Sequence, residues 1–166
     1  EYLSKNRRTA GETGRAAIKC GVNYIDLVFS FPEYLDSLGA ALQGQRERIL
    51  LTGHLGSTVK DGQYHKSRSP KKCELFFLDV LSKLRINYVD ILMLHNCDRQ
   101  KDYDTIMKPG GVFDLARRFR QEGKTRFIGF SGHTAAIAQQ AVESGEIDVL
   151  MFPINMAANA VPGKKD

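Results

Sequence analysis

The hydrophobic pattern has one dominant stretch, residues 87–98 (NYVDILMLHNCD), in the middle of the chain. Its centre, residues 89–94, is apolar at every position except Asp90, which is typical of a strand with both faces covered in a parallel sheet. The stretch ends in a polar cluster that begins with His95. Because α/β folds place their chemistry where parallel strands run out into the following loops, we expect His95 to be a functional residue.

The rest of the chain alternates helix with strand. Apolar spacing predicts helices over residues 13–20, 35–42, 70–84, 112–119 and 135–144. Short apolar runs predict further strands over residues 22–26, 49–52, 126–131 and 149–155. The polar segments 56–68 and 98–111 are interpreted as loops, and Ser69 is expected to cap the helix that starts at Pro70. This alternation predicts a parallel sheet with right-handed crossovers.

Composition narrows the class of protein. The chain has 166 residues, of which 42% are hydrophobic and 26% charged, as expected for one globular domain. No run approaches the roughly 20 apolar residues of a membrane span. The net charge of +5 is spread along the chain, so it suits an anionic cofactor or simple solubility and does not indicate nucleic-acid binding. Three widely spaced cysteines form neither a disulfide framework nor a CxxC site, which favours a reducing cytoplasm.

Polar residues at the strand ends decide between an open sheet and a barrel. No glycine-rich dinucleotide fingerprint or phosphate loop opens any predicted helix. Instead, residues able to do chemistry follow at least four strands: Asp26, His54, His95 with Asn96, and Ser131 with His133. In a closed barrel these ends converge on one mouth, whereas an open sheet would string them along an edge. The barrel is therefore the preferred interpretation.

Four segments carry a resemblance to a known family. They are residues 21–26 (GVNYID), 38–42 (LGAAL), 88–95 (YVDILMLH) and 123–131 (GKTRFIGFS). In this order and spacing the chain resembles the aldo/keto reductase family from about Thr9 to Lys165. Residues 129–133 (GFSGH) and 152–155 (FPIN) are most similar to the branch whose members often end in a ferredoxin-like cysteine run, although this chain has no such run.

The resemblance implies a fold of the α/β class, a (β/α)8 TIM barrel of which this chain supplies about five parallel strands, the second to the sixth. Residues 1–166 are then a single, incomplete aldo/keto reductase-like domain. An open arc of five strands would expose apolar edges. We therefore expect the chain to belong to a longer polypeptide, or a partner to complete the barrel.

The resemblance also implies reduction of a small-molecule aldehyde or ketone. The family uses Asp, Tyr, Lys and His; here Asp26 matches the Asp, and His95 matches the His that polarises the carbonyl. Phe31 stands where the family has its tyrosine, and His54 stands where it has its lysine. His54 is itself able to donate a proton, and Tyr34, three residues past Phe31, is an alternative donor.

The expected cofactor is NADP or NAD. By the resemblance, Ser131 and Asn155 contact the nicotinamide amide, with Gly132 and His133 in the same cofactor-binding loop. The loops that hold the phosphates in the family follow the seventh and eighth strands, which lie outside this sequence. On this basis the chain alone is expected to bind NADP(H) weakly.

Two other functions stay open at the level of sequence. Asp26, His54, His95 and His133 all follow strands, and imidazole with carboxylate can bind Zn²⁺ or Fe²⁺, which would allow a metal-dependent hydrolase. The spacing is not a metal fingerprint, however. Alternatively, the loss of the tyrosine at Phe31 and of the lysine at His54 would suit a catalytically inactive barrel that acts as a binding or regulatory module.

Overall fold

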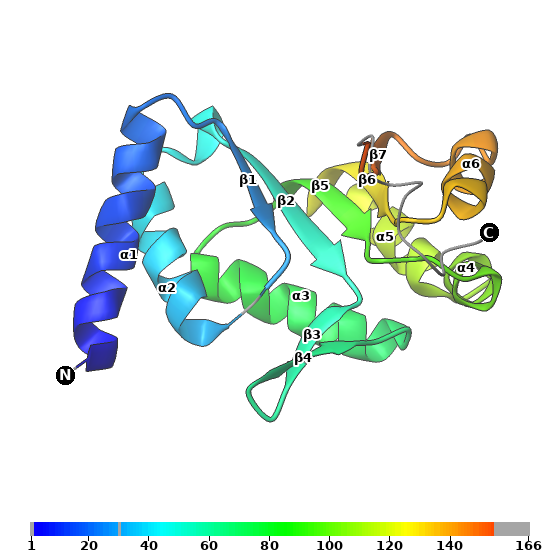
Figure 1. Cartoon of the computed structure of the whole chain (residues 1–166), viewed down its shortest axis with the longest axis horizontal. Coiled ribbons are helices and arrows are strands. Elements are labelled where there is room, and N and C mark those ends of the chain that lie inside the picture. The colour runs from blue at the N-terminus through cyan, green and yellow to red at the C-terminus, as the bar shows by residue number, and fades with distance from the viewer. Residues whose placement is uncertain (1, 30, 155–166) are drawn as a thin grey trace.

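A computed structural model describes residues 2–29 and 31–154. Its main feature is a curled, wholly parallel sheet with the strand order β1-β2-β5-β6-β7 (Figure 1). These strands are β1 (Tyr24–Leu27), β2 (Leu50–Leu55), β5 (Val89–Leu94), β6 (Thr125–Ser131) and β7 (Val149–Met151). The prediction of five parallel strands of a partial (β/α)8 barrel is confirmed.

Helices cover the convex side of the sheet. They are α1 (Tyr2–Lys19), α2 (Pro32–Leu42), α3 (Pro70–Leu84), α4 (Gln100–Met107), α5 (Val112–Gln121) and α6 (Ala135–Glu143), with a short 3₁₀ turn η1 (Arg46–Arg48). Figure 1 shows α1 beside α2 at one end of the sheet, and α4 and α6 at the other. None of the helices described is both long and apolar enough to cross a membrane.

The hydrophobic core lies between the sheet and these helices. Every side chain of β5 is buried, as the apolar run predicts. On α3 the predicted stripe meets the sheet through Cys73, Phe77, Val80, Leu81 and Leu84, all buried. Phe77 packs on Phe119 of α5 with ring centroids 4.9 Å apart. A central strand and two amphipathic helices therefore fix the frame on which the strand ends are held.

Two segments predicted as loops contain regular structure. Residues 57–66 form an antiparallel hairpin of β3 (Ser57–Lys60) and β4 (Gln63–Lys66), separate from the main sheet (Figure 1). The turn is Asp61-Gly62, with φ of 52° and 73°, which is the geometry that Asp-Gly favours in two-residue hairpins. Residues 56–68 were predicted to be a loop because of their polar composition, so the hairpin turn at Asp61-Gly62 was not recognised.

The second such segment, 98–111, contains α4. Tyr103 and Ile106, three residues apart, are its buried face, and the helix packs against α5. The apolar residues of α4 span only one helical turn, so their spacing was too short to predict a helix from the sequence. The predicted side-chain cap at Ser69 is also wrong, because its backbone instead donates to the Ser67 hydroxyl over 3.3 Å.

The cysteines are free thiols. Cys20 is exposed, whereas Cys73 and Cys97 are buried in the core. Burial raises the pKa of the Cys97 thiol to about 11. Cys97 therefore stays protonated at neutral pH and acts as a small apolar side chain rather than a nucleophile.

Candidate active site

Three parallel strands end at the same edge of the sheet and place polar side chains there. Asp26 lies on β1, His54 on β2, and His95 directly follows β5. The register pairs Asp26 with Thr52, so His54 projects from the same face two residues further along. His54 Nε2 lies 2.8 Å from Asp26 Oδ1, and His54 Nδ1 lies 2.9 Å from His95 Nδ1. The structure thus brings these three predicted residues into one hydrogen-bonded chain.

A fourth side chain, missed by the sequence interpretation, extends this hydrogen-bonded chain. The Tyr64 hydroxyl lies 2.8 Å from His95 Nε2, and the two rings meet edge to face with centroids 5.9 Å apart. Tyr64 comes from β4, which the turn at Asp61-Gly62 folds back along β3. That Asp-Gly pair, flanked by short alternating segments, was the signal by which Tyr64 could have been found.

The four residues differ in their access to solvent. The two imidazoles are buried, with His95 6% and His54 9% exposed, whereas Tyr64 is 39% exposed and the Asp26 side chain 30%. All four imidazole nitrogens have a partner within the chain. The arrangement is therefore a buried two-imidazole connection between a carboxylate and a phenol that both reach the surface.

The hydrogen bonds can be given consistent directions. The Asp26 carboxylate only accepts, so His54 donates from Nε2. With both imidazoles neutral, His54 Nδ1 accepts from His95 Nδ1, and His95 Nε2 accepts from the Tyr64 hydroxyl. Every donor then has an acceptor, and the carboxylate sets the direction of the whole chain.

Electrostatics favour the neutral forms of His95 and Tyr64. Burial, followed by repulsion from a charged His54 and from Arg68, lowers the pKa of His95 to about 3. Burial raises the pKa of Tyr64, while Arg68 opposes the shift. At neutral pH His95 is therefore an uncharged imidazole and Tyr64 a protonated phenol, able to pass a proton on or give one away.

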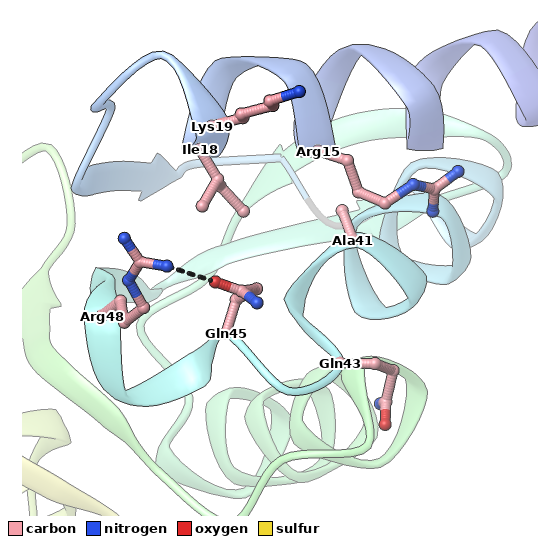
Figure 2. Close-up of a pocket in the computed structure, with 7 residues that line it drawn as sticks. All are labelled: Arg15, Ile18, Lys19, Ala41, Gln43, Gln45 and Arg48. Atoms are coloured by element: carbon pink, nitrogen blue, oxygen red, sulfur yellow. Dashed lines mark hydrogen bonds between the residues drawn. The ribbon is translucent and has the colours of Figure 1, made fainter.

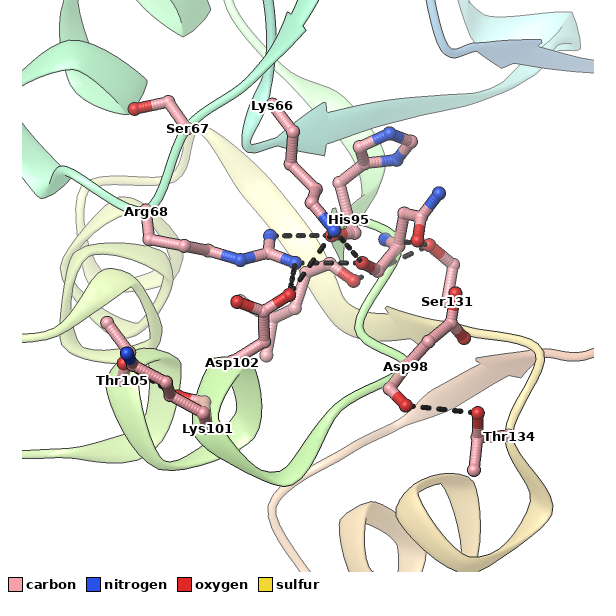
Figure 3. Close-up of polar contacts among 12 residues, drawn as sticks. Lys66, Ser67, Arg68, His95, Asp98, Lys101, Asp102, Thr105, Ser131 and Thr134 are labelled. Atoms are coloured by element: carbon pink, nitrogen blue, oxygen red, sulfur yellow. Dashed lines mark hydrogen bonds and ion pairs between the residues drawn. The ribbon is translucent and has the colours of Figure 1, made fainter. Parts of the chain in front are cut away.

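A cationic clamp holds the backbone that follows β5. Arg68 donates to the carbonyl oxygens of His95 and Asn96 over 2.7 and 2.8 Å, and Asp102 accepts from Arg68 at 3.3 Å and from Lys66 at 3.2 Å (Figure 3). Asn96 has φ of 47°, a left-handed conformation that asparagine tolerates. The clamp and this sharp turn fix where the His95 ring points.

An aromatic group lies next to Tyr64. Phe31, at the start of α2, stacks on Phe29 with ring centroids 6.1 Å apart, and Phe29 meets Tyr64 edge to face at 5.8 Å. Tyr34, on the next turn of α2, is 43% exposed, and its hydroxyl is not a member of the hydrogen-bonded chain. The phenol within reach of His95 is thus that of Tyr64.

The predicted cofactor-binding residues lie at the end of β6. The Ser131 hydroxyl accepts from the Asn96 amide over 3.0 Å. A Cβ at Gly132 would lie 2.6 Å from the Cys97 carbonyl oxygen, so only glycine fits there. His133 is exposed, and its Nδ1 lies 3.0 Å from Asp98 Oδ2. Asn155 lies outside the described residues.

His133 does not join the other histidines, which corrects the metal-site interpretation. Its imidazole pairs with Asp98, while the nitrogens of His54 and His95 are used on each other, on Asp26 and on the Tyr64 phenol. Within residues 2–29 and 31–154, no group of three or more His, Cys, Asp or Glu side chains is arranged to hold a metal ion. The nitrogen and oxygen atoms of the hydrogen-bonded chain lie in a row, whereas a metal ion needs its ligand atoms arranged around one point.

A separate hollow lies far from these strand ends in the fold. Figure 2 shows it between α1, α2 and η1, lined by Arg15, Ile18, Lys19, Ala41, Gln43, Gln45 and Arg48. Arg48 there donates to the Gln45 side chain over 3.1 Å. None of the predicted site residues lines it, so the hydrogen-bonded chain remains the candidate active site.

Comparison with known proteins finds a reductase and a dehydrogenase that are similar to this chain. The NADH-specific methylglyoxal reductase of Escherichia coli K12 is 27% identical over 169 residues, covering 94% of this chain and 51% of that protein. The L-galactose dehydrogenase of Arabidopsis thaliana is 28% identical over 154 residues, covering 89% and 46%. The chain thus spans about half the length of the curated relatives it matches.

A solved structure, of a putative aldo-keto reductase from Pseudomonas aeruginosa, superposes with a TM-score of 0.71 at 24% identity, covering 90% of this chain and 57% of that one. At that identity the likeness concerns the fold alone. The family model described as "Aldo/keto reductase family" matches residues 1–160. The curled parallel sheet and this match over nearly the whole sequence agree, and the chain belongs to the aldo/keto reductase family.

Proposed function

We propose that the protein reduces the carbonyl group of a small aldehyde or ketone with a reduced nicotinamide cofactor. The observation that carries the proposal is the hydrogen-bonded chain from Asp26 through His54 to His95 at the ends of adjacent strands. Such a group can hold and move a proton next to a carbonyl oxygen, which is what the reaction requires from the protein. Membership of the family supports the same chemistry.

The proposed site departs from the family pattern at two positions. We propose that Phe31 and His54 stand where the family has tyrosine and lysine. His54 keeps a hydrogen-bonding nitrogen toward Asp26 at 2.8 Å, whereas Phe31 has no proton to give. Asp26 then orients His54, and His95 acts on the substrate carbonyl through the Tyr64 hydroxyl, which lies 2.8 Å from His95 Nε2.

The cofactor would be NADPH or NADH, which supplies a hydride when bound. Its carboxamide would be held by Ser131 and Asn155, with Gly132 and His133 in the same cofactor-binding loop. Asp98 orders this loop, since it accepts from both the backbone amide and the ring of His133. Gly132 allows the loop to lie directly on Cys97.

We also propose a branch of the family, a cellular compartment and a means by which the barrel is completed. Residues 129–133 (GFSGH) favour the ferredoxin-associated branch of the family. The free thiols of Cys20, Cys73 and Cys97 suit a reducing compartment such as the cytoplasm. The exposed concave side of the sheet suits coverage by further polypeptide or by a partner that completes the barrel.

Turnover of carbonyl compounds tests the proposal. We expect the purified protein to oxidise NADPH or NADH in the presence of some member of a panel of aldehydes and ketones. Asp26→Asn and His95→Gln should each lower kcat/KM about 100-fold, because each breaks the proton-handling chain. The matched control is Asp36→Asn, which changes an exposed carboxylate on α2.

The same assay distinguishes the alternative of an inactive binding module. An absence of turnover with the whole panel, together with cofactor binding followed by fluorescence, would favour that alternative. Equal loss in Asp36→Asn and Asp26→Asn would show that the effect is not specific to the proposed site.

A further inference from the structure

We propose that Tyr64 is the proton donor for the substrate oxygen, and that it is recharged through His95 and His54. This inference rests on the proposed reductase function and names the donor which that proposal lacks. This donor differs from the family pattern, because Tyr64 comes from the β3-β4 hairpin and not from the position of Phe31.

The position of Tyr64 supports this role. Its hydroxyl lies 2.8 Å from His95 Nε2, and it is the more exposed end of a chain whose two middle members are buried. A substrate oxygen next to His95 would therefore meet the phenol before it met either imidazole nitrogen of His54. The Phe29 ring packs against the phenol ring of Tyr64, nearly perpendicular to it and with centroids 5.8 Å apart.

The proton transfer requires one proton more than the neutral form of the hydrogen-bonded chain from Asp26 to Tyr64 contains. In this charged form His54 carries protons on both nitrogens, beside the Asp26 carboxylate at 2.8 Å. His54 Nδ1–H then donates to His95 Nδ1, His95 Nε2–H donates to the Tyr64 oxygen, and the Tyr64 O–H is free to donate outward.

A reduced nicotinamide, when bound, would supply the hydride for the carbonyl carbon. As the carbon–oxygen π bond opens, the oxygen would take the proton of Tyr64. The O–H bond of Tyr64 breaks as the proton of His95 Nε2 moves to the phenol oxygen, and the proton of His54 Nδ1 moves to His95. The end state is the all-neutral pair of imidazoles beside the Asp26 carboxylate. One proton from water restores the charged form.

The surroundings place the extra proton on His54 rather than on His95. His54 faces the Asp26 carboxylate, whereas burial of the His95 ring, together with the positive charges of Arg68 and Lys66, lowers the pKa of His95 to about 3. A charged His54 is therefore needed before each turnover, because the proton given to the substrate must be replaced.

A pair of tyrosine variants tests the donor. Tyr64→Phe keeps the ring but removes the hydroxyl, and should lower kcat by about 100-fold or more while the KM for the carbonyl changes less than about threefold. Tyr34→Phe, which removes a hydroxyl outside the hydrogen-bonded chain, should keep kcat within about threefold. An active Tyr64→Phe variant, or a loss confined to Tyr34→Phe, would overturn the proposal.

A second readout is independent of turnover. The chain has four histidines, so their ring ¹⁵N signals can be resolved by NMR and assigned with single substitutions such as His65→Gln. Tyr64→Phe should shift the His95 Nε2 signal and leave His65 unchanged, with the urea unfolding midpoint preserved. An unperturbed His95 signal overturns the donor role alone. If no carbonyl is reduced although this signal shifts, the reductase function fails and the donor role fails with it.

Discussion

At the scale of single residues, Asp90 is a buried charge outside the site that accepts three hydrogen bonds. Its side chain is 3% exposed and accepts from Arg46 at 2.8 Å, from Arg126 at 3.1 Å and from the Leu51 amide at 2.9 Å. Burial opposes ionisation, but these donors outweigh it and lower the pKa of Asp90 below its usual 3.8. The carboxylate thereby ties β2, β5 and β6 together at the end of the sheet opposite the site.

The first prediction at this scale concerns Asp90→Asn. Removing the charge leaves Arg46 without its buried partner, so the free energy of unfolding should fall by roughly 3 kcal/mol at neutral pH. Because the pKa of Asp90 is lower in the folded state, its stabilisation is present above the unfolded pKa and is lost as pH falls through the folded pKa. The difference between wild type and variant should therefore shrink below about pH 4.

Urea unfolding at a series of pH values measures this difference. Asp79→Asn is the control, since Asp79 is 52% exposed and, among the residues described, pairs with Lys83 alone, one turn away on α3. It should change the free energy of unfolding by less than about 0.5 kcal/mol. A cost for Asp90→Asn that stays constant down to acid pH would contradict the ionised, buried carboxylate.

At the scale of elements, the β3-β4 hairpin is the piece on which the site depends most. It pairs with itself and not with the main sheet, so its register rests on the Asp61-Gly62 turn. The Thr58 hydroxyl adds a bond of 2.7 Å to the His65 carbonyl across the two strands. A change in the turn therefore reaches Tyr64 without passing through the core.

Gly62→Ala tests this dependence. Gly62 has φ of 73°, where a Cβ costs roughly 1 kcal/mol, so the hairpin should open more often. We expect amide hydrogen exchange in β3 and β4 to speed up by about five- to tenfold, while exchange in β5 stays unchanged. Gly62→Asn should have a smaller effect, because asparagine tolerates positive φ. Equal acceleration in β5 would show that the hairpin does not open on its own.

Which elements could be predicted from the sequence follows from how they are stabilised. The strand at residues 89–94 and the stripe of α3 bury long apolar runs, so their patterns show directly in the sequence. The hairpin and α4 bury little, and the hairpin is defined by backbone conformation at a two-residue turn. Local polar composition gave the wrong answer for both.

The same distinction explains the candidate site. Asp26, His54 and His95 were found because neighbouring parallel strands must bring their ends together, whatever lies between them in sequence. His133 follows a strand as well, but its ring pairs with Asp98 above the end of β6. The position of a residue after a strand therefore predicts where its backbone lies, but it does not predict which way its side chain points. Tyr64 was not predicted as a site residue because it lies on no strand of the main sheet.

At the scale of the whole molecule, the sheet is a curled half-barrel whose two sides differ. Its convex side is covered by helices, whereas its concave side exposes large apolar residues, among them Tyr24 at 39%, Leu50 at 44% and Phe127 at 41%. The strand register puts all three on the face that also carries Thr52 and His54. The site thus lies at one rim of a face whose other part is apolar and open.

Two phenylalanines on β6 test whether this face is open. Phe130 points to the helices and is fully buried, so Phe130→Ala should lower the free energy of unfolding by about 3–5 kcal/mol. Phe127 points to the concave face and is 41% exposed, so Phe127→Ala should cost only about 1 kcal/mol. Urea unfolding of both variants provides the comparison, with one strand and one substitution type in common. Equal costs would mean that the concave face is covered in solution, by a second copy or another segment, and a larger cost for Phe127 would reverse the assignment of inside and outside.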